Sequence, residues 1–171
     1  MIRYITYTIG RFKGQKSTMS GFYAFPKGQT NLPAILEFHG GGGRALVAHV
    51  KWAALNGYAG LSVNWGGERP LSDLKDTEPN TDWVALGVRR IGPNLHYNSM
   101  EPDELTIDSV KSPRNNNWFL LTLGCRRGIT FLEQQPEVNP ELIGVTGLSV
   151  GGKLTMDVAA IDSRIKVAAP R

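Results

Sequence analysis

The first forty positions alternate between apolar, β-branched and polar residues in a pattern that predicts strands. Residues 2–12 and 19–25 are rich in Ile, Thr, Tyr and Phe, and the polar segment 13–16 separates them like the turn of a hairpin. A turn-rich stretch then leads to the apolar run 34–38. Three strands are therefore expected before residue 40.

A helix and a further strand are expected after this run. His39 and four glycines follow it directly, and the pattern then predicts a helix over 44–56, with Asn56-Gly57 as its end signal. Residues 59–64 form another short apolar strand. This order of strand, helix and strand is the βαβ unit of a parallel sheet, whose strands are apolar because helices cover both faces.

The same order returns near the carboxyl end. Leu121, Cys125, Ile129 and Leu132 lie at offsets of 0, 4, 8 and 11, which places them on one face of a helix that runs to about residue 135. Cys125 on that face is expected to be a core thiol. A strand at 142–146, a helix at 149–161 and a strand from 165 follow. The fold class predicted is α/β, a mostly parallel sheet with helices on both faces.

Residues 66–114 break this regularity, because they are rich in proline and acidic residues and show no sustained period. A stretch that long inside one domain, here taken as 1–171, predicts a lid-like or substrate-binding insertion. Trp83, His96 and Tyr97 within it, and Trp65 just before it, are candidate substrate contacts, with packing in the core or lid as the competing interpretation.

Composition and charge exclude several function classes. The 171 residues include 19 basic and 15 acidic ones, a net charge of +4, but the basic residues are spread along the chain, so no nucleic-acid partner is expected. No run of 18 apolar residues predicts a membrane span, and the start does not resemble a signal peptide. With one cysteine and no Cys/His cluster, neither a disulfide, a structural metal nor a cofactor is expected. Localisation and oligomeric state stay open.

One pentapeptide indicates a chemistry. Gly147-Leu148-Ser149-Val150-Gly151 fits G-x-S-x-G, and it stands between a predicted strand and a predicted helix. A serine there must occupy a sharp, strained turn that exposes its hydroxyl, and side chains two positions away would collide. Gly147 and Gly151 remove that collision. The turn also brings Ser149 to the positive end of the next helix, where the Val150 N–H can bind an oxyanion.

A second oxyanion donor is expected from the four-glycine loop. This loop follows a parallel strand, and the ligand sites of open α/β sheets lie outside the carboxyl ends of the strands. Gly41 and Gly42 are the candidate donors, because backbone without side chains can approach a reacting carbonyl closely. His39, which ends a buried strand, is expected to be a hydrogen-bonded structural histidine.

Four segments together resemble the α/β-hydrolase superfamily and, within it, the acetyl xylan esterase and dienelactone hydrolase-like enzymes. The resemblance covers nearly the whole chain and implies a serine carboxylic-ester hydrolase that forms an acyl-enzyme on Ser149. It implies a small-molecule or carbohydrate ester as substrate, with acetylated sugar only as an analogy. The segments are Phe38–Gly43, Asn64–Gly67, Pro113–Trp118 and Gly144–Lys153.

The chain departs from the superfamily in one respect. In the superfamily the catalytic residues follow the order Ser, then Asp or Glu, then His along the sequence. In this chain no histidine follows Ser149. Asp157 and Asp162 do follow it, but they are expected to be exposed helix and loop residues. The chain is therefore expected to be an amino-terminal part of an enzyme, with its acid and base beyond Arg171 and little activity alone. The strand from Ile165 should form an unprotected edge that favours aggregation.

Three alternatives remain. Residues 147–153 nearly match a phosphate-binding loop, but Leu154 stands where that loop needs a Ser or Thr hydroxyl for Mg²⁺. Residues 40–45 match G-x-G-x-x-A of dinucleotide sites, although the next strand ends in Asn64-Trp65 and not in an acid. The third alternative is a non-catalytic carbohydrate or small-molecule binding protein built on a hydrolase scaffold. Lys153 and the pair Arg126-Arg127 are expected to be solvated surface charges.

Overall fold

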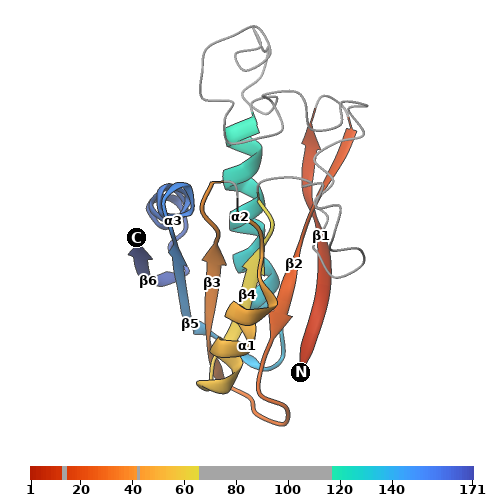
Figure 1. The fold of residues 1–171 in the computed structure, drawn as a ribbon, viewed down its shortest axis with the longest axis vertical. Coiled ribbons are helices and arrows are strands. Elements are labelled where there is room, and N and C mark those ends of the chain that lie inside the picture. The colour runs from red at the N-terminus through yellow and green to blue at the C-terminus, as the bar shows by residue number, and fades with distance from the viewer. Residues whose placement is uncertain (13–14, 42, 66–116) are drawn as a thin grey trace, which may run out of the picture.

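A computed structural model describes residues 1–12, 15–41, 43–65 and 117–171. In these residues six strands form one sheet, in the order β1-β2-β4-β3-β5-β6, and three helices pack on it (Figure 1). The insertion predicted at 66–114 lies outside the described residues. The strands are β1 (Ile2–Phe12), β2 (Gln15–Ala24), β3 (Leu32–Phe38), β4 (Ala59–Val63), β5 (Val138–Gly147) and β6 (Ile165–Pro170), and the helices are α1 (Val47–Leu55), α2 (Asn117–Glu133) and α3 (Val150–Ile161).

The strand pairing confirms the predicted fold class. β4, β3, β5 and β6 are parallel neighbours, whereas β1 and β2 form an antiparallel hairpin attached to the outer side of β4. Each parallel pair that is consecutive along the chain is joined by a helix, β3 to β4 through α1 and β5 to β6 through α3. The carboxyl ends of β3, β4, β5 and β6 therefore meet at one edge of the sheet.

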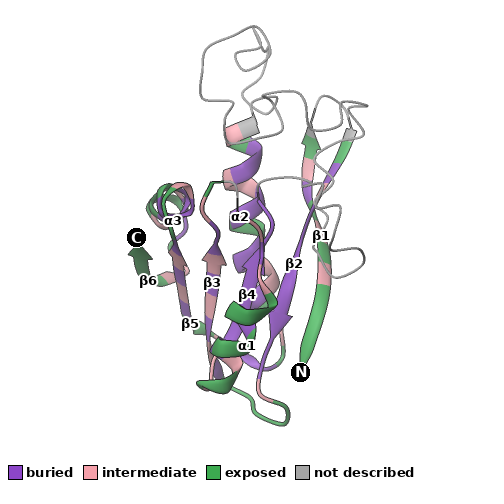
Figure 2. Cartoon of the chain, in the orientation of Figure 1, coloured by how far each residue is buried: buried purple, intermediate pink, exposed green. Residues whose placement is uncertain are grey.

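Helices cover both faces of the sheet, as predicted. α2 and α3 contact each other on one face, and α1 lies on the opposite face, in front of the sheet in Figure 1. The larger core lies between the sheet and α2, where the predicted apolar stripe of Leu121, Cys125, Ile129 and Leu132 is buried. Figure 2 shows the central strands as mostly buried, with exposure concentrated on β1, β6 and the outer side of α1.

Helix α1 is shorter than predicted, because it begins at Val47 and not at residue 44. Leu46 precedes it with extended backbone and no side-chain cap. Instead, the Leu46 N–H donates to the Ser62 hydroxyl of β4, 3.3 Å away. None of residues 40–46 is a Ser, Thr, Asp or Asn that could cap an earlier start of the helix. A tertiary contact therefore fixes where the helix begins.

Strand β6 occupies the edge of the sheet, as predicted for the strand from Ile165. Only Ile165 of the strand is partly buried, and Val167 is 65% exposed. A parallel strand normally has helices over both faces, but here α3 covers only one. Apolar side chains of β6 are therefore in contact with solvent.

Candidate active site

Ser149 occupies a strained turn between the end of β5 and the start of α3. Its backbone angles are φ 56° and ψ −116°, and Asn31 is the other non-glycine residue with positive φ in the described residues. Such a conformation is costly for a side chain with a Cβ, by about 1–3 kcal/mol, and persists only where the surroundings enforce it. Ser149 is also exposed. The predicted sharp turn, with its serine at the surface, is thus present.

Gly147 and Gly151 make this turn sterically feasible. A Cβ on Gly147 would lie 2.3 Å from the Gly151 carbonyl oxygen, and one on Gly151 would lie 2.1 Å from the Phe38 carbonyl oxygen. Both separations are far below van der Waals contact, and the atoms met are backbone atoms that cannot move aside. The close approach therefore requires glycine at both positions, for the reason inferred from the motif.

Hydrogen bonds from two neighbouring strands hold the turn. The Leu148 N–H donates to the Phe38 carbonyl at the end of β3 (3.3 Å). The Ser149 N–H donates to the Arg171 carbonyl just after β6 (2.7 Å), and the Arg171 N–H donates to the Gly147 carbonyl (2.9 Å). The turn is therefore fixed on both sides by the strands that flank β5.

The glycine loop after β3 lies beside this turn. A Cβ on Gly40 would be 3.3 Å from the Leu148 carbonyl oxygen and 3.8 Å from the Ser149 Cβ. A bond from the Gly43 N–H to the Gly40 carbonyl (2.9 Å) closes the loop, and Gly41 at its tip is exposed. Gly42, the other predicted donor, lies outside the described residues. The fold thus brings the loop and the serine together, although more than a hundred residues separate them.

Trp65 holds the base of the glycine loop. Its indole N–H donates to the His39 carbonyl (2.7 Å), and the two rings stack with centroids 4.6 Å apart and planes at 13°. Trp65 is fully buried, so the structure gives it a packing role and not the predicted contact with substrate. His39 is buried with Nδ1 2.8 Å from the Gly40 carbonyl, in agreement with its predicted structural role. Trp83, His96 and Tyr97 lie outside the described residues.

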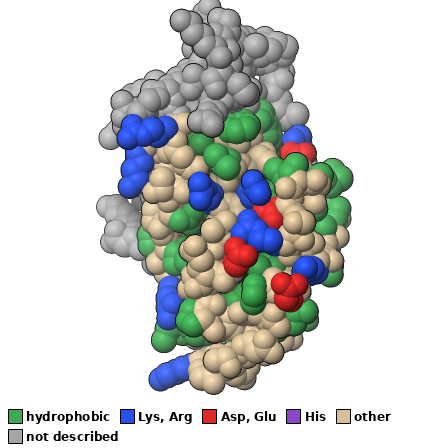
Figure 3. Space-filling model, turned by 180° about the vertical axis from the view of Figure 1, so that it is seen from behind, with side chains coloured by type: hydrophobic (Ala, Val, Ile, Leu, Met, Phe, Trp, Pro, Cys, Tyr) green, Lys and Arg blue, Asp and Glu red, His purple; other side chains and the backbone are tan. Residues whose placement is uncertain are grey.

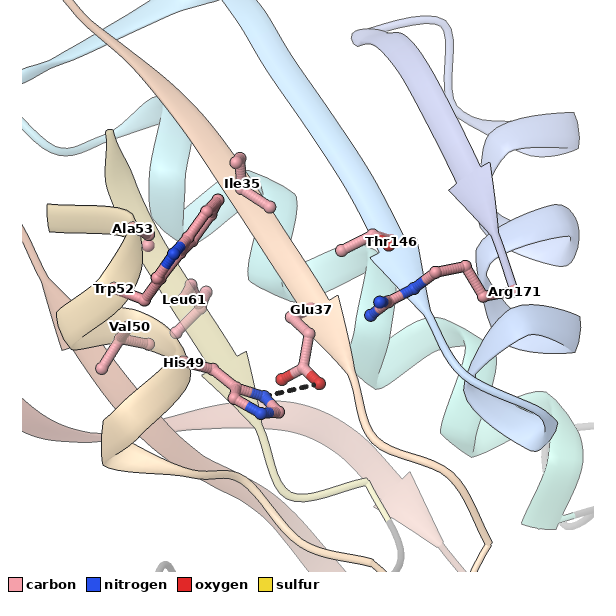
Figure 4. A pocket seen from close by; sticks show the side chains of 10 residues that line it. Ile35, Glu37, His49, Val50, Trp52, Ala53, Leu61, Thr146 and Arg171 are labelled. Atoms are coloured by element: carbon pink, nitrogen blue, oxygen red, sulfur yellow. Dashed lines mark ion pairs between the residues drawn. The ribbon is translucent and has the colours of Figure 1, made fainter. Parts of the chain in front are cut away.

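A second polar cluster lies on the α1 face of the sheet. Glu37 of β3 accepts from the Ser62 hydroxyl (2.5 Å) and lies 3.0 Å from His49 Nδ1 of α1 (Figure 4). The carboxylate stands between the serine and the histidine, whereas a catalytic triad needs the histidine in the middle. The cluster is therefore no second triad. Its members are too far apart in sequence for any local motif to reveal it.

Asp162 corrects one prediction. It was expected to be exposed, but it is 3% exposed and binds two arginines, Arg126 of α2 (2.9 Å) and Arg164 (2.7 Å). Hydrogen bonds from Arg164 are the main cause that lowers the pKa of the Asp162 carboxyl to about 2, against the opposing effect of burial. Arg126 is correspondingly engaged and not merely solvated. Figure 3, which shows the back of the molecule, has acidic and basic side chains side by side on that face.

The residues around α3 disfavour a nucleotide site. Thr155, the nearest hydroxyl to the position that a phosphate-binding loop would need, is fully buried and donates to the Gly151 carbonyl (2.8 Å). Lys153 pairs with Asp157 (2.5 Å) and lies 4.8 Å from the centre of the Trp118 ring. Neither group is therefore directed at a bound phosphate, and the partly buried Asp157 is a helix residue paired with lysine.

The described residues show neither a metal site nor a membrane-spanning helix. They contain no group of three or more His, Cys, Asp or Glu side chains placed to hold a metal ion. No described helix is long and apolar enough to cross a membrane. Cys125 is fully buried, and burial raises the pKa of its thiol, so it is a core residue as expected.

No family model and no curated protein matches the chain, but solved structures resemble it. An acetyl xylan esterase from Paenibacillus sp. R4 superposes with a TM-score of 0.66 at 22% identity, over 99% of this chain and 53% of that one. Acetyl xylan esterase 1 from Thermoanaerobacterium sp. JW/SL YS485 gives 0.63 at 17%, over 97% and 50%. An α/β-hydrolase from Penicillium sp. sh18 gives 0.58 at 18%, over 96% and 43%.

These likenesses show the fold. The chain has the α/β-hydrolase architecture of esterase structures, as the sequence resemblance predicted. It spans about half the length of the two acetyl xylan esterases. Because a shared fold hosts many activities, the chemistry has to be argued from the site itself.

Proposed function

We propose that the α/β-hydrolase fold of this chain supports serine carboxylic-ester hydrolysis, with Ser149 as the nucleophile. The observation that carries the proposal is the exposed, positive-φ backbone of Ser149 between two glycines whose Cβ atoms would clash with backbone. Strained backbone of this kind clusters at functional sites. The start of an ordinary helix does not require it. The esterase structures with the same architecture support a hydrolase of this general kind.

The proposed oxyanion site is formed by the N–H groups of Val150 and of the glycine loop. Val150 is the first residue of the twelve-residue helix α3, so the helix dipole favours negative charge there. Gly41 is the described candidate for the second donor, since Gly40 beside it lies against the serine turn. Gly42 remains a candidate from the sequence. Removing one such donor from an enzyme typically lowers kcat by about 10²–10³-fold.

The proposed reaction has two displacement steps. A base takes the proton from the Ser149 hydroxyl, whose oxygen attacks the ester carbonyl, and the resulting oxyanion collapses as the alcohol leaves with a proton. Water then attacks the acyl-serine and releases the carboxylic acid and the free hydroxyl. Small-molecule or carbohydrate esters are the proposed substrates, with acetylated sugars as the analogy given by the esterase structures.

The base and its acid are assigned to polypeptide beyond Arg171. Among the described histidines, His39 is stacked under Trp65 and bound at Nδ1, and His49 is paired with Glu37 on the α1 face. Without a base, a serine hydroxyl is a weak nucleophile at neutral pH. The 171-residue chain should therefore show only the residual catalysis that an oxyanion site and binding provide, about 10³–10⁴-fold over water.

The test uses p-nitrophenyl acetate as an activated ester. We expect the purified chain to become acetylated at Ser149, detected by peptide mass spectrometry, with slow release of p-nitrophenol. Ser149→Ala should abolish that adduct, and Ser163→Ala, at an exposed serine before β6, should leave it unchanged. Acetylation spread equally over both serines would refute Ser149 as the nucleophile. Rapid turnover that depends on Ser149 would instead place the base within the 171 residues.

The binding-protein alternative rests on the same histidines, since neither described one is placed as a base. Trp65, a candidate for stacking on a sugar, is buried, and the nearby Trp118 is partly buried with Lys153 over its ring. The two interpretations differ in whether Ser149 becomes acetylated, because a binding protein does not need a reactive serine. Saturable sugar binding together with an inert Ser149 would favour the alternative.

A further inference from the structure

A cavity of about 430 Å³ lies between helix α1 and the sheet, away from the glycine loop. Its volume is within the range of about 300–1,000 Å³ that is usual for small-molecule sites. Figure 4 shows Trp52 of α1 on one side, Arg171 on the other, and Ile35 of β3 between them. Glu37 and His49 stand together at one end of the cavity.

The walls of this cavity are mainly apolar. Its apolar lining residues come from α1 and from two strands, with Trp52 of α1, Ile35 of β3 and Leu61 of β4 among them. A flat apolar group would bury surface against the Trp52 indole, which is 61% exposed in this structure. Each Å² of apolar surface removed from water contributes about 25 cal/mol.

The acidic group of the cavity already has donors. Glu37 accepts the Ser62 hydroxyl at one oxygen, and at the other it lies 3.0 Å from His49 Nδ1. Each Glu37 oxygen thus already has a contact within the protein. Glu37 is therefore already engaged by groups of the protein itself.

Arg171 is the group best placed to receive a ligand. Figure 4 shows its side chain extending past Thr146 toward the interior of the cavity. Its backbone is fixed by hydrogen bonds with Gly147 (2.9 Å) and Ser149 (2.7 Å). Among the described residues, no carboxylate lies within ion-pair distance of the guanidinium. A guanidinium fork matches a carboxylate by two parallel hydrogen bonds.

We propose that this cavity binds a small carboxylic acid with a flat apolar body. The carboxylate pairs with the Arg171 guanidinium, and the body lies against Trp52 and Ile35. A single guanidinium fork matches the two oxygens of a carboxylate, whereas a phosphate dianion would need further donors that the lining does not supply. The few polar groups on the walls disfavour a sugar, which needs many hydrogen bonds. The proposal does not depend on esterase activity, because binding alone tests it.

The probe is 2-naphthoate, titrated into the 171-residue chain by calorimetry at pH 7.5, with the neutral 2-naphthamide as its matched analogue. We expect saturable binding of one naphthoate per chain and at least tenfold weaker binding of the amide. Arg171→Gln should weaken naphthoate at least tenfold and leave the amide unchanged. Arg171→Lys should fall between, because it keeps the charge but loses the fork.

Lys51→Gln is the matched control, since it removes one exposed positive charge from α1 at a position that does not line the cavity. It should leave the naphthoate Kd within twofold. Equal weakening by Lys51→Gln and Arg171→Gln would mean unspecific charge attraction and would overturn the proposal. So would the absence of saturable binding, or equal affinity for acid and amide. A failure of Ser149 acetylation would leave this result unaffected.

Discussion

Trp65→Phe is the substitution that tests how the serine turn is supported. It keeps an aromatic ring for the stack on His39 but removes the indole N–H that donates to the His39 carbonyl at 2.7 Å. Both residues are buried, so water cannot readily replace the lost donor. Losing one partner of a buried hydrogen bond destabilises a protein by about 1–3 kcal/mol, and the smaller ring leaves a cavity. We expect a total loss of about 2–4 kcal/mol.

The measurement is urea unfolding followed by circular dichroism at 222 nm, which does not depend on tryptophan fluorescence. Trp52→Phe is the control, because Trp52 is 61% exposed and therefore loses little buried surface on substitution. That variant should stay within about 0.5 kcal/mol of the unmodified chain. A Trp65→Phe variant as stable as Trp52→Phe would refute the argument that Trp65 holds the loop.

A second readout separates support of the loop from general packing. Gly40, next to His39, lies against the Ser149 Cβ, so a loosened loop should move the proposed oxyanion donors. We expect Trp65→Phe to slow acetylation of Ser149 by p-nitrophenyl acetate about tenfold, under conditions where the chain is still folded. A loss of stability with an unchanged acetylation rate would mean that Trp65 packs the core without positioning the loop.

Three further predictions follow from single contacts. Gly151→Ala places a Cβ 2.1 Å from the Phe38 carbonyl oxygen and should lower the free energy of unfolding by about 3 kcal/mol, measured by urea unfolding. The pKa of Asp162 is about 2, below its unfolded value of about 3.9, so its contribution of about 2 kcal/mol is present above pH 4 and lost as the pH falls toward 2. Asp162→Asn should flatten that part of the stability profile. Val167→Lys, on exposed edge strand β6, should reduce aggregation measured by light scattering, and unchanged scattering would contradict an edge-driven process.

The sequence was sufficient to predict the parallel part of the fold. Its strands are short apolar runs between turn signals, and the apolar stripe of α2 has an unbroken helical period, so both are encoded locally. The serine turn was predictable for a similar reason, since only glycine fits beside it at 147 and 151. Where a local pattern has one physical solution, the prediction and the structure agree.

The errors occurred where distant residues determine the outcome. Asp162 looks like a loop residue in sequence, but it is buried where Arg164 and Arg126 of the distant helix α2 both bind its carboxylate. Trp65 stands at the end of a strand that leads toward the site, and only the stack on His39 shows that it faces inward. The pair of Glu37 and His49 depends on how α1 crosses β3, which no periodicity specifies.

Ser149 can remain strained because three other parallel strands act on its turn at once. β3 supplies the Phe38 carbonyl and leads into the glycine loop, and Trp65 just after β4 lies beneath that loop. Arg171 follows β6 directly, and its carbonyl accepts the Ser149 N–H. The backbone strain of about 1–3 kcal/mol is small beside the free energy of several such contacts, so relaxing the turn would cost more than it releases. Weakening any one of these strands should therefore act at the serine, even where the altered residue is far from any bound ester.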